Sequence, residues 1–515
     1  MPDKIQLTLS PEEAAFEERI KKAAANYLGM SENDFNYRIS RKSIDARSKD
    51  IKINLWLDIF DLSQTVSSHE IRFKFENVSA SREVHIIGAG PAGLFAALKC
   101  LEVGLKPVLF ERGKDVSERK KDIAQIYRKH TVLPDSNYCF GEGGAGTFSD
   151  GKLYTRSNKR GDIDRILQLL HYHGAADEIL YESHPHIGTD KLPEIIRKMR
   201  QTIVDCGGEV YFNSRLTDIV IENSEVKAIV INGADRYKVQ YLILATGHSA
   251  RDIYYLLHER DVKLEMKPFA MGVRVEHPQK LIDDIQYHHS KNSYLPAASY
   301  SLTTQVNNRG VYSFCMCPGG YIVPAATSSD EIVVNGMSSS SRHTPYANSG
   351  MVVEVHTEDL EKYFKHGDLA GLVFQEDIEK MAFINGGRGQ IAPAQRLSDF
   401  VKGRLSSSLP ENSYIPGLLS SPVHFWLPEN IGKRLQQAFK DFDKKMKGFL
   451  TNEALVAGVE SRSSSPVRIP RDPDTFQHIA IKGLFPCGEG AGYAGGIVSS
   501  AMDGENVIAK IKELQ

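Results

Sequence analysis

The chain has 515 residues, of which 25% are charged and 41% are hydrophobic, and its formal net charge is −2 at pH 7. This length predicts two or three domains, because ordinary domains contain about 100–200 residues. The small net charge excludes an overall basic field for nucleic acid or membranes, and no apolar run approaches the roughly 20 residues of a membrane-spanning helix. Six scattered cysteines and the lack of a signal-like start predict a cytoplasmic protein with reduced thiols and no membrane partner.

Residues 1–80 are predicted to form a small α+β domain. Residues 4–10 alternate between polar and apolar side chains like a strand, and the following letters SPEE match a capping box with proline at the first helical position. Apolar residues recur at helical spacing from Phe16 to Tyr27, which predicts one buried helix face, and Gly29 ends that helix. The domain therefore begins with a strand and a helix.

A charged hairpin is predicted to complete this domain. Residues 41–60 indicate two strands joined by a charged turn. The basic residues of the hairpin are Arg38, Arg41, Lys42, Arg47, Lys49 and Lys52. We interpret the hairpin as a solvated surface, and the alternative is a surface that binds RNA or a protein partner.

A dinucleotide-binding pattern follows. Residues 84–113 are predicted to form a buried strand, a helix and a second strand, which together make a βαβ unit. Gly88, Gly90 and Gly93 lie at the first turn, where glycines allow the backbone and the helix N-terminus to approach a pyrophosphate. Glu111 follows at the end of the second strand, where a carboxylate can accept hydrogen bonds from ribose hydroxyls. The combination predicts a dinucleotide site.

Together with the remaining elements, this pattern predicts three domains. The fold class is α/β for the dinucleotide-binding domain, and α+β for the chain overall. In order, we predict a helix at 189–206, an antiparallel meander at 209–233, a strand at 241–247, strands and glycine turns with a helical tail at 251–450, and a strand and helix at 483–514. The predicted domains are an N-terminal α+β domain (1–80), a discontinuous Rossmann domain (81–250 and 455–515) and a β-rich substrate or cap domain (251–454).

Three distant segments resemble the FAD-binding scaffold of the glutathione-reductase-type flavoproteins. They are HIIGAGPAGLFAALKCLEVGLKPVLFERG, YLILATG and GLFPCGEGAGYAGGI, in the order of that family. The resemblance implies non-covalent FAD, with the second segment crossing under the cofactor and the last helix pointing its N-terminus at the flavin. Glu489 stands where that family usually has Asp, which keeps the charge but lengthens the reach.

Nearly the whole chain is similar to the uncharacterised FAD-dependent dehydrogenases, also labelled NAD(FAD)-utilizing dehydrogenases. The likeness is carried by RKSIDAR, GEGGAGTFSDGKLYTR, HPHIGTDKL, ATGHSARD, GVRVEHPQ and VESRSSSPVRI. It implies a cofactor and a broad reaction type, with a β-rich substrate domain over the flavin, and it supplies no substrate.

A second glycine loop, from Gly141 to Gly146, has the same GxGxxG spacing. The residues before it are too few and too polar for a buried strand, and those after it show no helical period. We predict that this loop is another wall of the first cofactor site, and the alternative is a plain surface loop. A third GxGxxG pattern begins at Gly490, but too few residues follow it for another βαβ unit. The sequence therefore predicts one Rossmann domain, and we expect NADH or NADPH, as a transient electron donor, to bind without a Rossmann domain of its own.

The predicted cofactor-binding residues come from the two glycine loops, the end of the second strand, the meander, the 241–247 strand and the last strand and helix. They are Gly88, Gly90, Pro91, Ala92, Gly93, Glu111, Arg112, Gly143, Gly144, Gly146, Ser149, Lys152, Leu216, Ala245, Thr246, Gly247, Gly488, Glu489, Gly495, Gly496 and Ile497. We expect Ser149, Asp150 and Lys152 to supply polar contacts to the pyrophosphate or the flavin.

Three residues are candidates for catalysis. Arg274 shares a strand face with Glu276, and Arg462 precedes the last FAD segment; an arginine can bind a carboxylate or phosphate with two hydrogen bonds. His248 follows the predicted 241–247 strand and can act as an acid or a base. The alternatives are structural: ion pairs for the two arginines and a hydrogen-bonded turn residue for the histidine.

Cys315 and Cys317 form a C-x-C pair whose side chains would share one face of a strand. We predict two buried, reduced thiols, and the alternative is a redox pair. We expect no metal site, because neither H-x-H pair, at 171–173 or 184–186, lies in a ligand set of familiar spacing.

The sequence thus predicts an FAD-dependent oxidoreductase that acts on a small, anionic or unsaturated metabolite. One alternative is a flavoprotein that resembles the tRNA-modifying flavoenzymes and uses the N-terminal domain for RNA, and another is a non-catalytic flavin-binding protein. We expect a small-molecule partner and no nucleic-acid partner. Neither the substrate nor the oligomeric state follows from the sequence.

Overall fold

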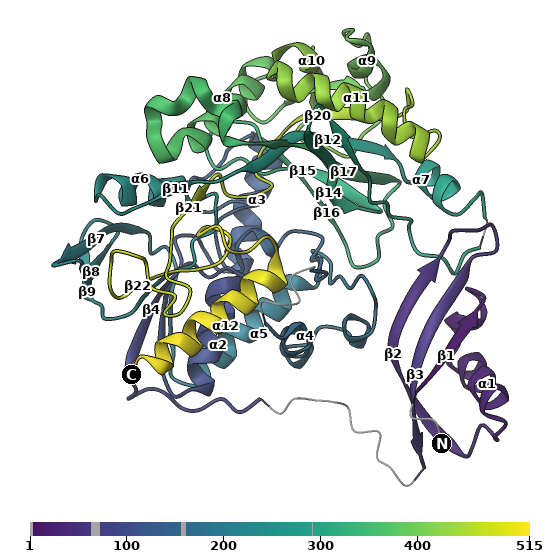
Figure 1. Ribbon diagram of the computed structural model, residues 1–515, viewed down its shortest axis with the longest axis horizontal. Helices are drawn as coiled ribbons and strands as arrows, with labels where there is room; N and C mark the ends of the chain where they lie inside the picture. The colour runs from purple at the N-terminus through teal and green to yellow at the C-terminus, as the bar shows by residue number, and fades with distance from the viewer. Residues whose placement is uncertain (1–3, 63–72, 156–160, 291) are drawn as a thin grey trace.

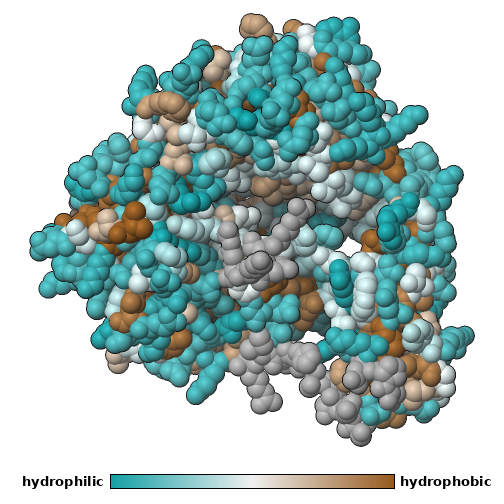
Figure 2. Space-filling model, viewed as in Figure 1, coloured by the Kyte–Doolittle hydropathy of each residue, from teal (hydrophilic) through white to brown (hydrophobic). Residues whose placement is uncertain are grey.

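The computed structural model describes residues 4–62, 73–155, 161–290 and 292–515, which form six β-sheets with helices packed against them (Figure 1). A three-stranded sheet lies at one side, a five-stranded parallel sheet lies low in the view, and a seven-stranded sheet lies above it. Figure 2 shows hydrophilic side chains over most of the same face. Within the described ranges, no helix combines the length and the apolar character needed to cross a bilayer.

The N-terminal sheet is antiparallel and is covered by one helix. Its strand order is β1 (Lys4–Leu9), β3 (Lys52–Asp61) and β2 (Phe35–Asp45), and the helix is α1 (Glu17–Leu28). Every second residue of β1 is buried, as the alternation in the sequence predicts. The buried side chains of β1, β3 and α1 form a small core of their own.

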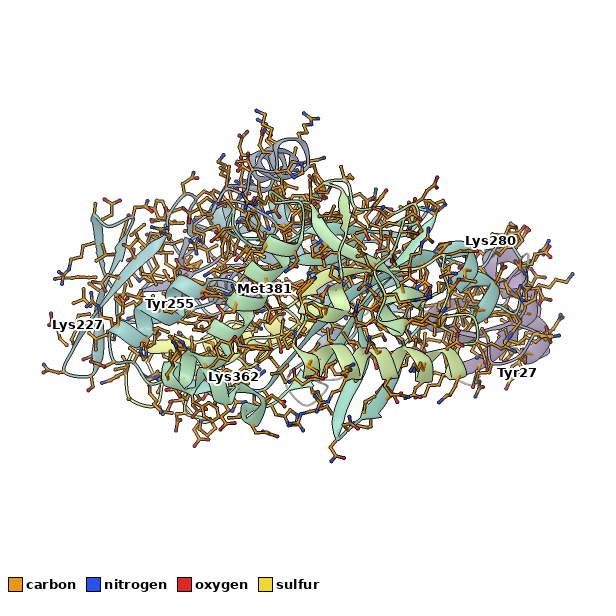
Figure 3. All side chains as sticks on the ribbon, turned by 90° about the horizontal axis from the view of Figure 1, so that it is seen from above. Tyr27, Lys227, Tyr255, Lys280, Lys362 and Met381 are labelled. Atoms are coloured by element: carbon orange, nitrogen blue, oxygen red, sulfur yellow. The ribbon has the colours of Figure 1, made fainter. Side chains whose placement is uncertain are left out.

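The predicted first helix is wrong at its start. The capping box does form, because Ser10 and Glu13 each accept a hydrogen bond from the backbone N–H of the other. It closes only a 3-10 turn (Glu13–Ala15), since the extended backbone of Phe16 (φ −122°) interrupts the helix before α1 begins. Phe16 and Tyr27 are 36% and 63% exposed, and Figure 3 shows Tyr27 at one end of the molecule. The buried face of α1 is therefore narrower than predicted and consists of Ile20, Ala24 and Ala25.

The five-stranded sheet is parallel and contains the predicted βαβ unit. Its order is β22 (Leu484–Pro486), β10 (Leu242–Leu244), β4 (Glu83–Ile87), β5 (Lys106–Phe110) and β6 (Glu209–Tyr211). One face shares a core with α2 (Pro91–Glu102), α5 (Leu192–Asp205) and α12 (Ile497–Glu513). The other face shares a core with the antiparallel meander of β7 (Leu216–Glu222), β8 (Glu225–Ile231) and β9 (Asp235–Lys238).

The seven-stranded sheet is mixed and has its own core. Its order is β13 (Thr303–Val306), β14 (Arg309–Cys317), β17 (Tyr346–Val355), β12 (Phe269–Pro278), β20 (Leu455–Glu460), β18 (Ala392–Arg396) and β19 (Leu418–Ser420). Its upper side in Figure 1 carries α8 (Ala370–Asn385), α9 (Leu397–Lys402), α10 (Val423–Trp426) and α11 (Glu429–Lys445). The other side faces the parallel sheet.

The region predicted as strands and glycine turns contains more helix than expected. The prediction misses α8, α6 (Arg251–Glu259) and α7 (Gln279–Gln286). Apolar residues lie around most of α8, so no single helical stripe marks it in the sequence. The remaining elements are α3 (Val116–Lys129), α4 (Ile163–Tyr172), β11 (Glu265–Met266), β15 (Gly320–Pro324), β16 (Val334–Ser338), β21 (Val467–Arg468) and 3-10 turns at Gly144–Gly146, Asp177–Leu180 and Thr357–Leu369.

The N-terminal sheet docks on the body of the protein through the basic hairpin. The backbone N–H of Lys42 donates to the carbonyl of Tyr181 at 2.8 Å, and the N–H of Ser183 donates to the carbonyl of Lys42 at 3.0 Å. The Lys42 ammonium lies 3.0 Å from the Glu182 carboxylate, and Arg41 donates to the Ser183 hydroxyl at 3.2 Å. These contacts occupy part of the basic surface.

Candidate functional site

One cavity of about 940 Å³ lies between the parallel sheet and the seven-stranded sheet. Residues at or just beyond the carboxyl ends of β4, β5, β10 and β22 line it, namely Ile87, Phe110, Ala245 and Cys487. Open α/β sheets bind their ligands at this edge, where loops and helix N-termini converge. We call the side formed by Gly88, Gly90, Gly144, Gly495 and Gly496 the glycine wall, and the side formed by Tyr300, Cys315, Cys317, Asn335 and Arg342 the side-chain wall.

The first glycine loop has room only for glycine at two positions. A Cβ atom on Gly93 would lie 1.9 Å from the carbonyl oxygen of Gly88. Gly88 has φ +102°, and its Cβ would lie 2.5 Å from the carbonyl oxygen of Ala245. No side chain caps the N-terminus of α2, which begins at the cavity after Gly90. The first N–H groups and the dipole of α2 are therefore available to an anion such as a pyrophosphate.

Glu111 is fixed at the cavity by backbone hydrogen bonds. Its Oε2 accepts from the N–H of Ala89 at 2.8 Å, and its Oε1 accepts from the N–H groups of Gly113 and Gly141 at 2.9 and 3.0 Å. The residue is 4% exposed and lines the cavity. A carboxylate has roughly four acceptor positions, so Oε2 keeps one for a ligand hydroxyl.

A second uncapped helix also begins at the cavity. Gly496 precedes α12 without any side-chain cap, and added Cβ atoms on Gly495 and Gly496 would meet nothing within 4 Å. This end is held in place because the N–H of Gly488 donates to Asp503 at 2.7 Å, and Arg471 pairs with the same carboxylate at 2.6 Å. Asp503 is a site-supporting residue that the sequence reasoning missed.

The second glycine loop lies against the first. The N–H of Gly143 donates to the carbonyl of Ala89 at 2.8 Å, and a Cβ atom on Gly144 would lie 3.0 Å from the Cα of Gly90. Gly144 and Gly146 line the cavity, and a 3-10 turn rather than a long helix follows. In this arrangement the two loops contribute to one cavity.

The comparisons with known proteins agree with this geometry. Residues 268–463 match the family model described as FAD-dependent protein, C-terminal domain-like, and residues 1–60 match a domain of unknown function (DUF8436). An uncharacterized protein from Clostridium beijerinckii is 40% identical over 515 residues, which cover 96% of each chain. The chain belongs to this family of FAD-dependent proteins. Thiamine thiazole synthase from Aeropyrum pernix is 27% identical over 183 residues, which cover 33% of this chain and 55% of the relative.

Two solved structures share a weak overall likeness with this FAD-dependent protein. The flavin-dependent brominase Bmp2 has a TM-score of 0.35 at 14% identity, over 85% of this chain and 80% of its own. A geranylgeranyl bacteriochlorophyll reductase-like protein from Thermoplasma acidophilum has a TM-score of 0.34 at 12% identity, over 84% and 79%.

The residues present fit FAD. The uncapped start of α2 would hold the pyrophosphate, Glu111 would hold a ribose, and the start of α12 would face the flavin, which supplies two-electron chemistry when bound. The predicted cofactor residues that line the cavity are Gly88, Gly90, Pro91, Ala92, Glu111, Arg112, Gly144, Gly146, Ser149, Lys152, Leu216, Ala245, Thr246, Gly247, Glu489, Gly495, Gly496 and Ile497. Those that do not line it are Gly93, Gly143 and Gly488, which shape its turns. The individual roles stay predictions.

Arg274 lies behind the side-chain wall rather than in the cavity. Its guanidinium is fully buried and donates to Asn348 at 2.9 Å, Glu460 at 3.1 Å and the carbonyl of Cys315 at 2.8 Å. Burial would lower the pKa of Arg274, but Glu460 and the nearby thiols raise it above its ordinary value. The geometry favours the structural alternative, in which Arg274 supports the wall.

Glu276, which shares β12 with Arg274, is also buried and does not line the cavity. It accepts hydrogen bonds from the backbone N–H of Ser413 at 2.9 Å and from the Ser413 hydroxyl. Burial raises the pKa of Glu276 to about 7, although these hydrogen bonds and Arg274 oppose the shift.

Arg462 lines the cavity, but its guanidinium is engaged in a buried ion network. It lies 2.6 Å from Glu331 and 2.8 Å from Glu379, and Arg251 lies 2.8 Å from the same Glu379 carboxylate. Burial would raise the pKa of Glu379, but Arg251 and Arg462 hold it well below its ordinary value. Arg462 thus has few donors left for a substrate.

His248 lies on the cavity surface between two oxygen acceptors. Its Nε2 lies 3.1 Å from the carbonyl oxygen of Arg462, and its Nδ1 lies 3.3 Å from Glu489 Oε2. The Nε2 contact is a hydrogen bond, whereas Nδ1 makes no hydrogen bond and lies only at ion-pair distance from Glu489. This arrangement gives Glu489 a charge partner within the protein at the cavity.

The C-x-C prediction is partly wrong about burial, and the strand at this pair is irregular rather than regularly extended. The pairing of β14 with β17 is irregular between Phe314 and Cys317, and Cys315 has φ +45°, a left-handed conformation that is rare for side chains other than glycine. Cys315 is exposed and Cys317 is buried, and both line the cavity. A bulge, which alternation in the sequence does not reveal, separates them.

Arg342 of the side-chain wall is a residue that the sequence reasoning did not select. Asp150 is buried between Lys152 at 3.1 Å and Arg342 at 2.9 Å. Lys152 and Asp150 belong to the second glycine loop, whereas Arg342 follows β16. Burial would raise the pKa of Asp150, yet the two cations lower it to about 2. No spacing rule could pair residues that only the fold brings together.

Proposed function

We propose that this chain is an FAD-dependent oxidoreductase that transfers electrons between its flavin and a small metabolite. One observation carries the proposal: a single cavity combines a wall suited to a dinucleotide with a wall of polar and thiol side chains from another sheet. A flavin held at the start of α12 would face that second wall, where a substrate has room to bind.

The charges beside the side-chain wall support an anionic substrate. Lys152 and Arg342 line the cavity and share one buried carboxylate, Asp150, so one positive charge remains in excess. A positive excess in a cavity attracts an anion, and an arginine offers it several donors. We propose a small carboxylate or a similarly charged unsaturated compound as the substrate.

The electron donor in this proposal is NADH or NADPH, bound transiently in the same cavity. The contact of Gly143 with Ala89 supports this assignment, because it joins the two glycine loops into one wall and leaves neither as a separate nucleotide domain. The nicotinamide would therefore bind and leave before the metabolite enters.

The contacts of the basic hairpin support a small-molecule partner rather than RNA. Arg38 pairs with Asp58 at 2.7 Å, Arg47 with Asp45 at 2.5 Å and Lys52 with Asp50 at 2.7 Å. Because each of these cations has a carboxylate partner, the hairpin presents a weak positive field.

Anaerobic mixing of the FAD-loaded protein with NADPH, and separately with NADH, tests the proposal. We expect one of them to bleach the visible flavin absorbance rapidly, and we expect the other to act more slowly. The reduced protein is then mixed with small carboxylates that contain a double bond, and reoxidation without oxygen identifies an acceptor. Lack of bleaching by either nucleotide would overturn the nicotinamide assignment and redirect the search to donors among the metabolites.

A further inference from the structure

Two thiols occupy the side-chain wall at the end of β14. Cys315 is exposed, and Cys317 is buried, but both line the cavity. The Sγ of Cys317 lies 3.2 Å from the carbonyl oxygen of Cys315, so the two residues are in direct contact. The two residues are adjacent at the bulge in β14, where Cys315 has φ +45° and the pairing with β17 is irregular.

Two cations lie beside the buried thiol. Lys152 Nζ is 3.6 Å and Arg274 Nη2 is 3.5 Å from the Sγ of Cys317. Burial would lower the pKa of Lys152, but the neighbouring Cys317 and Asp150 raise it, so the ammonium stays charged. Positive charges at this range stabilise a thiolate, which is the reactive form of cysteine.

The exposed thiol responds to the same cations. Burial among its neighbours raises the pKa of Cys315 to about 11, and the charges of Lys152 and Arg274 oppose that rise. Cys317 is therefore the thiol that contacts both cations, and Cys315 is the thiol that a molecule in the cavity can reach.

The other cysteines of the chain lack this combination. Cys100 is buried in the core of the parallel sheet, and burial alone raises its pKa. Cys139 lines the cavity, but its Sγ donates to the carbonyl of Ala325 at 3.5 Å. Cys487 also lines the cavity, where burial and Asp503 raise its pKa. Cys139 is thus a natural control for a thiol in the cavity that has no second cysteine two residues away.

We propose that Cys315 and Cys317 are a redox-active dithiol that exchanges two electrons with the flavin, and that the protein accepts a small dithiol or disulfide compound in this cavity. In the step, two S–H bonds break and one S–S bond forms, while two electrons and two protons pass to oxidised FAD. A dithiol substrate restores the pair by thiol–disulfide exchange, in which it becomes a disulfide and the two cysteines become thiols. The inference rests on the proposed function, because it needs FAD in the cavity.

A reductive titration tests the pair directly. The FAD-loaded protein is oxidised with diamide, freed of reagent and titrated anaerobically with dithionite while the flavin absorbance is followed. We expect the wild type to take up two electrons more per chain than C315S or C317S, and we expect C139S to match the wild type. Mass spectrometry of the peptide that contains both cysteines should show a loss of about 2 Da after oxidation, since each S–S bond removes two hydrogens.

A labelling experiment tests the role of the cations. In the reduced, FAD-loaded protein, K152M should slow the reaction of the Cys315–Cys317 pair with iodoacetamide at pH 7 by about tenfold, because a positive charge that stabilises a thiolate is removed. K121M serves as the control, because Lys121 is exposed and pairs with Glu118 on α3. An unchanged rate in K152M would overturn the thiolate assignment.

The outcomes separate this inference from the proposed function. If FAD binds and the wild type takes up no more electrons than C315S, the dithiol is refuted and the oxidoreductase proposal stands. If the purified protein does not bind FAD, the proposed function itself fails, and the 2 Da loss then reports only whether the two thiols can pair.

Discussion

The two walls of the cavity present different parts of the polypeptide. The glycine wall offers backbone N–H groups and the starts of α2 and α12, and it depends on the absence of Cβ atoms at Gly88 and Gly93. The side-chain wall offers side chains, and buried ion pairs behind it hold them in place. The difference teaches that one wall is sensitive to added volume and the other to altered charge.

A single methyl group in the glycine wall should have the largest effect. In G93A the new Cβ would overlap the carbonyl of Gly88 at 1.9 Å, so α2 must move away from β4. A displacement of about 1 Å can cost about 100-fold, and we expect at least that loss in FAD affinity. Titration of the apoprotein with FAD, followed by flavin fluorescence, measures it.

G233A is the matched control for this substitution. Gly233 has φ +74°, and its added Cβ meets nothing within 4 Å. The left-handed backbone alone should cost about 1–2 kcal/mol of unfolding free energy and leave FAD affinity unchanged. If G93A binds FAD as tightly as G233A does, the glycine wall does not depend on close packing of the loop.

Removal of one buried charge should give the next largest effect. E379Q leaves Arg251 and Arg462 to share Glu331, so one of the two buried positive charges loses its compensation, which costs about 3–5 kcal/mol. Urea unfolding at pH 7 measures the loss. E376Q, on the same helix and only partly buried, should change the unfolding free energy by less than about 1 kcal/mol.

The same variant predicts a dependence on pH. Arg251 and Arg462 hold the pKa of Glu379 well below its ordinary value of 4.5, so the folded protein keeps the carboxylate ionised while the unfolded chain takes up a proton. This contribution to stability is present above about pH 4.5 and is lost as the pH falls. The unfolding free energy of E379Q should therefore fall less than that of the wild type as the pH drops below 4.5. If the unfolding free energies of the two proteins fall by the same amount in this range, the ion network does not stabilise the fold in this way.

The difference between the walls also explains what the sequence could predict. Gly88, Gly90, Gly93 and Glu111 lie within one βαβ unit, so local spacing was enough to bring them together. The pairing of Asp150 with Arg342 joins residues 192 positions apart, and only the packing of two sheets creates it. Likewise, the bulge at Cys315 and the buried helix α8 leave no periodic signal in the sequence.

Glu276 should show the opposite pH dependence to Glu379. Burial raises its pKa to about 7 from 4.5, so the folded protein holds a proton that the unfolded chain releases between these values. The resulting stability is fully present below about pH 4.5 and is lost as the pH rises through 7, which amounts to about 3 kcal/mol. E276Q should therefore be more stable than the wild type at pH 8 by up to about 3 kcal/mol and similar to it at pH 5. Equal differences at both pH values in urea unfolding would refute the raised pKa.

The smallest effect is expected for Glu111, the charged side chain that supports the glycine wall. In E111Q, the amide oxygen can still accept from Gly113 and Gly141, but its NH₂ group then faces the N–H of Ala89. The loss of one hydrogen bond to a charged acceptor costs about 2 kcal/mol, which corresponds to about 30-fold in FAD affinity. FAD titration measures the change.

E142Q separates ligand binding from folding in this test. Glu142 is also buried, accepts from the N–H of Val116 at 2.8 Å and pairs with Arg200, but it does not line the cavity. Its substitution should therefore lower the unfolding free energy and leave FAD affinity unchanged. If E111Q and E142Q reduce FAD affinity equally, Glu111 supports the loop only through its hydrogen bonds to backbone N–H groups. If only E111Q reduces FAD affinity, the Glu111 carboxylate contacts the nucleotide. The glycine wall, which otherwise offers backbone groups, would then also contribute one charged side chain.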